Sequence, residues 1–124
     1  MIAYTTFGTN NLLTAAEFYD ELFALMGVKR IFDMETFVAW GKAEGEPMFC
    51  ITHPFDGQDA SVGNGTMVAL AVQSTDIIDQ MHAKALAMGG QNEGDPGLRM
   101  EKYYCAYFRD LDGNKLNLFY VAAN

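Results

Sequence analysis

The order of predicted elements repeats along the chain, and this repeat limits the fold more than any other feature. The first half predicts a strand, a helix and three strands, at residues 2–9, 10–27, 28–33, 36–42 and 47–53. The second half predicts the same order, at residues 66–73, 74–90, 91–97, 103–110 and 114–121. A βαβββ unit alone leaves one face of its sheet bare, so we expect the two units to pair.

The domain organisation follows from this repeat. We expect a single domain over residues 1–124, with unit one at 1–55, a linker at 56–65 and unit two at 66–124. A chain of this length buries roughly two-thirds of its unfolded surface. The expected fold class is α+β, with the two βαβββ units forming a cupped mixed sheet around a cleft.

Charge and cysteine content exclude several classes of function. The formal net charge is -8, which argues against binding to nucleic acid or to an anionic membrane and is compatible with a neutral or cationic ligand. No run of residues is long and apolar enough to span a membrane, and the N-terminus resembles no signal peptide. Cys50 and Cys105 form no CxxC motif, so we expect a cytoplasmic protein with reduced thiols.

Strand alternation divides each sheet into a face that packs on a helix and an opposite face, here called the open face. The bulky residues fall on the helix side, and small or polar residues fall on the open face. A concave face with small side chains is typical of a cleft. The candidate ligand-binding residues are Tyr4, Thr6, Trp40, Cys50, Thr52, Met67, Asn117 and Phe119. Alternation does not decide which of Tyr103 and Tyr104 points inward, and Arg99 either holds an anionic group or pairs with Glu101 or solvent.

Four segments resemble the vicinal oxygen chelate superfamily of glyoxalase I, bleomycin-resistance proteins and extradiol dioxygenases. They are "NNLLTAAEFYDELFALMG", "GNGTMVALAV", "MGGQNEGDPGLR" and, most specifically, "YYCAYFRDLDGNKLNLFY". The resemblance covers essentially the whole chain. It implies two βαβββ units cupped around a small-molecule site, usually in a dimer.

The resemblance also implies where a metal would be bound. Metal-dependent members carry His or Glu on the first and last strand of each unit, and these places correspond to Tyr4, Cys50, Met67 and Asn117. A divalent metal needs several anionic or imidazole ligands, which these four residues do not supply. We therefore expect no metal and no cofactor. Asn117 is expected to hydrogen-bond to a ligand, to Tyr4 or to a neighbouring backbone group.

Three functions fit these observations. The first is a metal-free cleft, as in a bleomycin-resistance protein, that binds a small, largely apolar or cationic molecule. The second is a glyoxalase-type lyase or isomerase that needs no metal or uses another metal site; no catalytic residue is assigned, and no His is predicted beside the Cys50 thiol. The third is a dimeric scaffold with a vestigial cleft. The sequence leaves open whether the cleft forms within one chain or across a homodimer.

Overall fold

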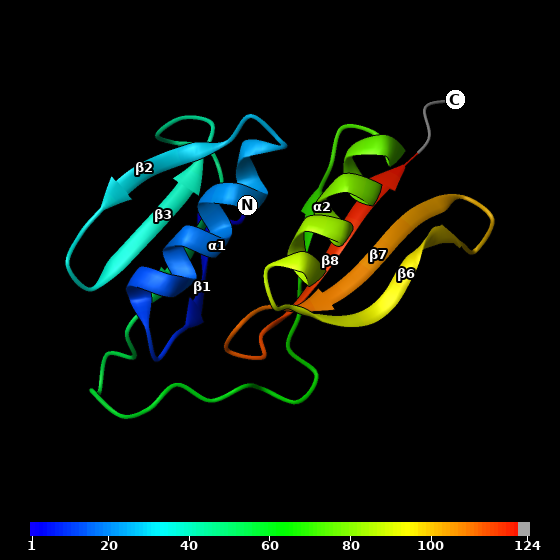
Figure 1. The fold of residues 1–124 in the computed structure, drawn as a ribbon. Helices are drawn as coiled ribbons and strands as arrows, with labels where there is room; N and C mark the ends of the chain where they lie inside the picture. The colour runs from blue at the N-terminus through cyan, green and yellow to red at the C-terminus, as the bar shows by residue number, and fades with distance from the viewer. Residues whose placement is uncertain (122–124) are drawn as a thin grey trace.

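The computed structural model describes residues 1–121 and contains both predicted units in the predicted order (Figure 1). Unit one consists of β1 (Tyr4–Gly8), α1 (Leu12–Ala24), β2 (Lys29–Asp33), β3 (Phe37–Gly41) and β4 (Met48–Thr52). Unit two consists of β5 (Val68–Ala71), α2 (Thr75–Ala87), β6 (Gln91–Arg99), β7 (Tyr103–Arg109) and β8 (Lys115–Val121). The repeated βαβββ order and the α+β class are confirmed.

Each unit forms its own four-stranded mixed sheet. The strand orders are β1-β4-β3-β2, here sheet A, and β5-β8-β7-β6, here sheet B. The first strand of each unit pairs in parallel with the last, and the remaining pairs are antiparallel. The two sheets share no ladder, so the described chain does not close a single sheet around a cleft.

Local signals fix both helix starts. The Asn11 side chain accepts a hydrogen bond from the Thr14 backbone N–H at 3.1 Å, so Asn11 is the cap of α1. The Ser74 hydroxyl likewise accepts from the Ile77 N–H at 3.2 Å at the start of α2. Gly27, which follows α1, has a φ of +72°, a conformation that glycine adopts without steric cost. Neither helix of the described chain is long and apolar enough to cross a bilayer.

Strand β6 is longer than the short strand predicted at residues 91–97. Its register against β7 shifts twice, between Asn92 and Gly94 and between Gly94 and Gly97. These irregularities accommodate the glycines and the intervening proline at a sheet edge, so pairing continues to Arg99.

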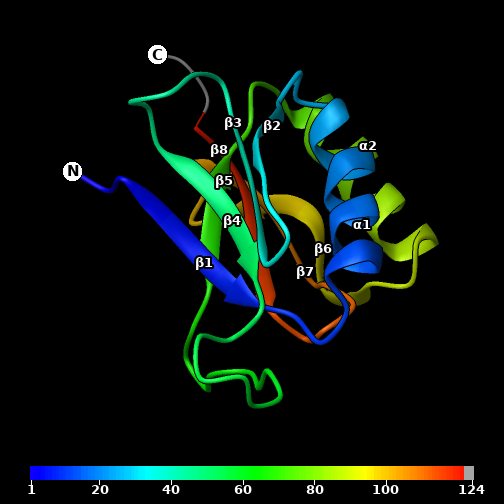
Figure 2. The ribbon, with the colours of Figure 1, turned by 90° about the vertical axis from the view of Figure 1, so that its left-hand side faces the viewer.

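One hydrophobic core holds the two units together. The helix-facing sides of both sheets and both helices contribute to it, and the Phe18 ring of α1 lies 6.4 Å from the Phe108 ring of β7. Figure 2 shows both helices on the same side of the molecule. Because both helix-facing sides meet in this one core, the open faces of sheets A and B point outward, away from it.

A buried polar network also joins the units. The Tyr19 hydroxyl of α1 donates to Asp110 Oδ2 at 2.6 Å, just after β7. Asn114 Nδ2 donates to the Gly8 carbonyl at 3.0 Å and to Asp110 Oδ2 at 3.1 Å. Burial raises the pKa of Asp110, although these hydrogen bonds partly oppose the rise, and burial with the nearby Asp110 charge raises the pKa of Tyr19.

Candidate functional site

The open face of sheet A carries the predicted residues of unit one. Tyr4 is 57% exposed and Thr6 is exposed, whereas Cys50, the register partner of Thr6, is fully buried. Burial raises the pKa of the Cys50 thiol, which disfavours the nucleophilic thiolate. Sheet A therefore presents a phenol and a hydroxyl, with an inert thiol beneath them.

A cavity of about 740 Å³ lies where this open face meets the segment between β4 and β5. Thr6 and Thr52 line it together with His53, Asp56 and Asp59. The Thr52 hydroxyl already donates to the His53 carbonyl at 2.9 Å, which leaves it less able to donate to a ligand. The structure brings these two predicted residues together at the acidic end of sheet A.

The open face of sheet B carries the other predicted residues. Met67, just before β5, is 42% exposed, and Ala69 and Ala71 are also exposed. The Phe119 ring of β8 stacks on Tyr103 of β7, with ring centroids 5.3 Å apart. Small residues thus lie beside an aromatic wall.

Asn117 lies in the middle of this face, opposite Ala69 and Tyr107 in the two neighbouring strands. It is 3% exposed, and its Oδ1 atom has no hydrogen-bond partner among residues 1–121. Two of the three partners expected for Asn117, a neighbouring backbone group and Tyr4, therefore do not bond to its Oδ1 atom in the described chain. A buried amide oxygen without a partner costs about 1–3 kcal/mol, so Asn117 Oδ1 is a candidate contact for a ligand.

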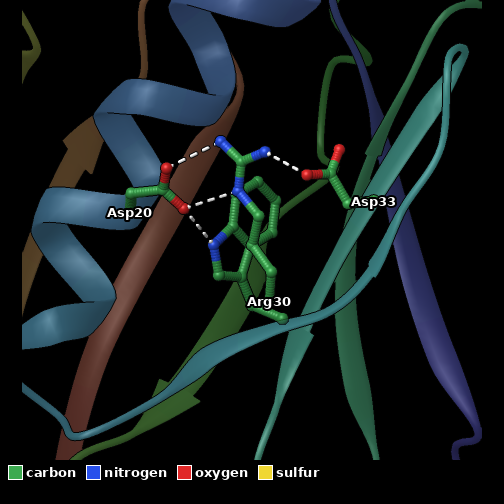
Figure 3. A network of polar contacts seen from close by, with 4 residues as sticks. Asp20, Arg30 and Asp33 are labelled. Atoms are coloured by element: carbon green, nitrogen blue, oxygen red, sulfur yellow. Dashed lines mark hydrogen bonds and ion pairs between the residues drawn. The ribbon is translucent and has the colours of Figure 1, made fainter.

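The prediction that Trp40 lines the cleft is wrong. Its ring is 1% exposed and packs in the core, on the helix side of β3. The indole N–H donates to Asp20 Oδ1 at 2.9 Å. Arg30 donates to the same carboxylate twice, from Nε at 2.9 Å and from Nη2 (Figure 3). Register decides this placement, because Trp40 pairs with Phe49 and therefore shares its core-facing side.

Arg30 holds this network together. It also donates to Asp33 at 3.0 Å, so one guanidinium joins two carboxylates (Figure 3). The hydrogen bonds from Arg30 lower the pKa of Asp20. The Asp20 carboxylate is hydrogen-bonded to both the Arg30 guanidinium and the Trp40 indole, so the network has a structural rather than a ligand-binding arrangement.

The four positions that correspond to family metal ligands are divided between the two sheets. Tyr4 and Cys50 belong to sheet A, whereas Met67 and Asn117 lie on the open face of sheet B. Their phenol, thiol, thioether and amide groups do not fit a divalent cation. No cluster of three or more His, Cys, Asp or Glu side chains suited to a metal occurs within residues 1–121. The residues present therefore do not match the metal centre that the fold implies.

Sequence reasoning missed part of the open face of sheet B. Tyr103 and Tyr107 lie on it, while Tyr104 points to α2 and donates to Asp79 Oδ1 at 2.6 Å. The Arg99 guanidinium lies 5.7 Å from the Tyr107 ring centroid, and Lys115 Nζ lies 5.6 Å from the same centroid. Strand alternation puts Lys115 on the same face as Asn117 and Phe119, whereas the irregular pairing of β6 hid the position of Arg99.

Comparisons with known proteins identify the family. The chain is similar to the solved structure of a glyoxalase/bleomycin resistance protein from Albidiferax ferrireducens T118, with 34% identity, a TM-score of 0.91, and coverage of 98% of this chain and 99% of that one. A comparison with models of protein families gave no match, and neither did a search of curated proteins.

More distant solved structures share the fold. A glyoxalase-related enzyme from Fulvimarina pelagi has 19% identity and a TM-score of 0.75, with coverage of 97% of this chain and 87% of that one. A lactoylglutathione lyase from Agrobacterium tumefaciens has 17% identity and a TM-score of 0.71, with coverage of 97% and 92%. Fold and sequence together define a protein of the vicinal oxygen chelate type. The chain belongs to the glyoxalase/bleomycin resistance protein family.

Proposed function

We propose that this protein is a metal-independent binder of a small, largely apolar molecule, and that residues 1–124 act as a single domain in a cytoplasmic homodimer. The shared core supports the single domain, because neither unit buries its helices alone. The two free, buried cysteines are compatible with a reducing compartment.

Asn117 is the observation that carries the binding proposal. Its amide is buried on an outward face, beside exposed alanines and a stacked aromatic pair, and its oxygen has no partner in the described chain. A ligand that places its apolar part on the aromatic wall and a donor near Asn117 would satisfy this oxygen.

The arrangement of the two open faces supports the proposed homodimer. Each chain supplies one open face from unit one and one from unit two, and both carry exposed apolar side chains such as Tyr4 and Met67. A second copy that places its sheet A opposite sheet B would cover these side chains and build a cleft from both units. The chain alone offers half-sites.

A glyoxalase-type lyase is the alternative. The lactoylglutathione lyase from Agrobacterium tumefaciens has a similar fold, but the likeness extends to the fold alone. The side chains of Tyr4, Cys50, Met67 and Asn117 argue against a metal-dependent lyase. Metal analysis of protein purified without chelators tests this, since stoichiometric zinc, nickel or iron would favour the lyase.

The binding proposal is tested by thermal unfolding with a panel of small aromatic compounds. A compound at 100 times its Kd stabilises the folded protein by about 2.7 kcal/mol. Asn117→Leu, which removes the amide at similar volume, should abolish this stabilisation, whereas Asn64→Leu in the exposed segment between β4 and β5 should preserve it. Equal stabilisation of both variants would contradict the proposed site. Light scattering measures the homodimer, and a monomer at micromolar concentration would contradict it.

A further inference from the structure

Basic side chains gather on the open face of sheet B. Of the eight Lys and Arg residues in the chain, four lie on this face or at its edge: Arg99, Lys102, Arg109 and Lys115. The chain as a whole carries sixteen acidic residues and a net charge of -8. Half of the basic residues of an acidic protein are therefore gathered on or beside this one face.

Most of this positive charge is not neutralised within the described protein. Arg109 pairs with Glu93 at 2.9 Å, but Arg99, Lys102 and Lys115 form no ion pair within residues 1–121. Each of these three lies over a tyrosine ring instead, with Lys102 Nζ 5.5 Å from the Tyr103 centroid.

Two of the cations lie near the same ring. The Arg99 guanidinium and Lys115 Nζ lie 5.7 and 5.6 Å from the centroid of Tyr107. Lys115 is also the direct cross-strand partner of Arg109, whose charge is paired with Glu93, so the Lys115 charge is the one left without a counter-ion at this pair of positions. An anion beside Tyr107 would supply it.

Asn117 gives an independent indication of a ligand at the same place. It is the cross-strand partner of Tyr107, it is 3% exposed, and its Oδ1 is unpartnered among the described residues. The stacked rings of Tyr103 and Phe119 adjoin it on the same face. Cation, acceptor and aromatic wall thus lie within a few neighbouring strand positions.

We infer that the open face of sheet B binds a small hydroxylated aromatic carboxylate. The carboxylate lies beside Tyr107, where Arg99 and Lys115 attract it, the ring packs on Tyr103 and Phe119, and a hydroxyl donates to Asn117 Oδ1. The inference rests on the proposed function and specifies its ligand. It replaces the cationic ligand that the net charge suggested, because charges a few ångströms away outweigh a screened overall charge.

Calorimetric titration with two matched probes tests the charge requirement. The probes are 4-hydroxybenzoate and 4-hydroxybenzamide, which have nearly the same shape but differ in charge. We expect the carboxylate to bind at least tenfold more tightly than the amide. Benzoate, which keeps the charge and lacks the hydroxyl, should bind more weakly than 4-hydroxybenzoate because Asn117 Oδ1 then stays unpartnered.

Variants test the location. Arg99→Gln and Lys115→Gln should each weaken 4-hydroxybenzoate binding about fivefold, and the double variant about 25-fold, the effect of roughly 1 kcal/mol for each partly exposed charge pair. Lys42→Gln removes the same charge from unit one, where Lys42 is exposed, and should leave affinity unchanged. Unfolding curves of the variants confirm that each is folded.

The outcomes separate this inference from the proposed function. If the amide binds as tightly as the carboxylate, with loss on Asn117→Leu, the cleft binds small molecules but the anion site is refuted. If Lys42→Gln weakens binding as much as Arg99→Gln, the attraction is non-specific and the inference is again refuted. If neither probe binds, the inference fails. The proposed function fails as well only if no compound of the wider panel stabilises the protein.

Discussion

Replacing Tyr19 by Phe tests whether the buried network around Asp110 holds the two units together. The substitution removes one oxygen atom and keeps the ring, which is fully buried among the core aromatics. The lost hydroxyl donates to Asp110 Oδ2 at 2.6 Å. A hydrogen bond to a charged group contributes about 1.5–3 kcal/mol, and Oδ2 retains the longer bond from Asn114 at 3.1 Å. We expect Tyr19→Phe to lower the free energy of unfolding by about 2 kcal/mol at neutral pH, and Tm by about 8 °C.

The loss should depend on pH with a defined sign. Burial raises the pKa of Asp110 above its ordinary 3.8, so the folded protein holds this proton longer than the unfolded chain does. The contribution of Asp110 to stability therefore falls as pH rises from about 4 through the raised pKa, and the Tyr19 hydrogen bond opposes that fall because it favours the carboxylate. Tyr19→Phe removes this hydrogen bond, so it should lower the free energy of unfolding more at pH 7.5 than at pH 4.

Urea unfolding at both pH values, at one protein concentration, measures this prediction. Tyr104→Phe is the matched control, because Tyr104 also donates to a carboxylate at 2.6 Å but does so at the protein surface, on Asp79. It should change stability by less than about 0.5 kcal/mol. Equal losses in the two variants, or a Tyr19→Phe loss that does not change with pH, would refute the reasoning.

Three further predictions concern other parts of the molecule. Arg30→Gln should return the pKa of Asp20 toward its ordinary 3.8 and reduce stability by less than about 1 kcal/mol, since the pair is partly exposed. The loss should be full above pH 3.8 and should fade as pH falls from there through the lowered pKa of Asp20, as titration of unfolding against pH would show. Cys50 should resist iodoacetamide in the folded protein and react in urea, because burial raises the pKa of its thiol; rapid modification without unfolding would contradict this. Gly94→Ala should cost about 1–3 kcal/mol in urea unfolding, because a Cβ there would lie 2.9 Å from Cδ1 of Tyr107.

Local patterns were sufficient to predict the architecture. The periodicity of each segment, the possible helix caps (Asn11 or Thr14, and Ser74 or Thr75) and the alternation in β5 and β8 depend on neighbours a few positions away, which a sequence displays directly. The structure then selects Asn11 and Ser74 as the caps. The resemblance of the segment around residues 103–120 to its family was likewise visible without coordinates. The irregular pairing of β6 could not be predicted from the sequence, because its bulges depend on how β7 accommodates them.

The sequence by itself determined the fold class, the two units and the chemistry of the open faces, because these follow from residue order and period. Tertiary structure decided which of these side chains meet. The register of β3 against β4 places Trp40 in the core. Because the two units share that core, their open faces lie on the outside. The path of β6 places Arg99 near Tyr107. The physical reason is that contacts between residues distant in the chain depend on how whole elements pack, and a shift of one strand position exchanges the faces of a sheet.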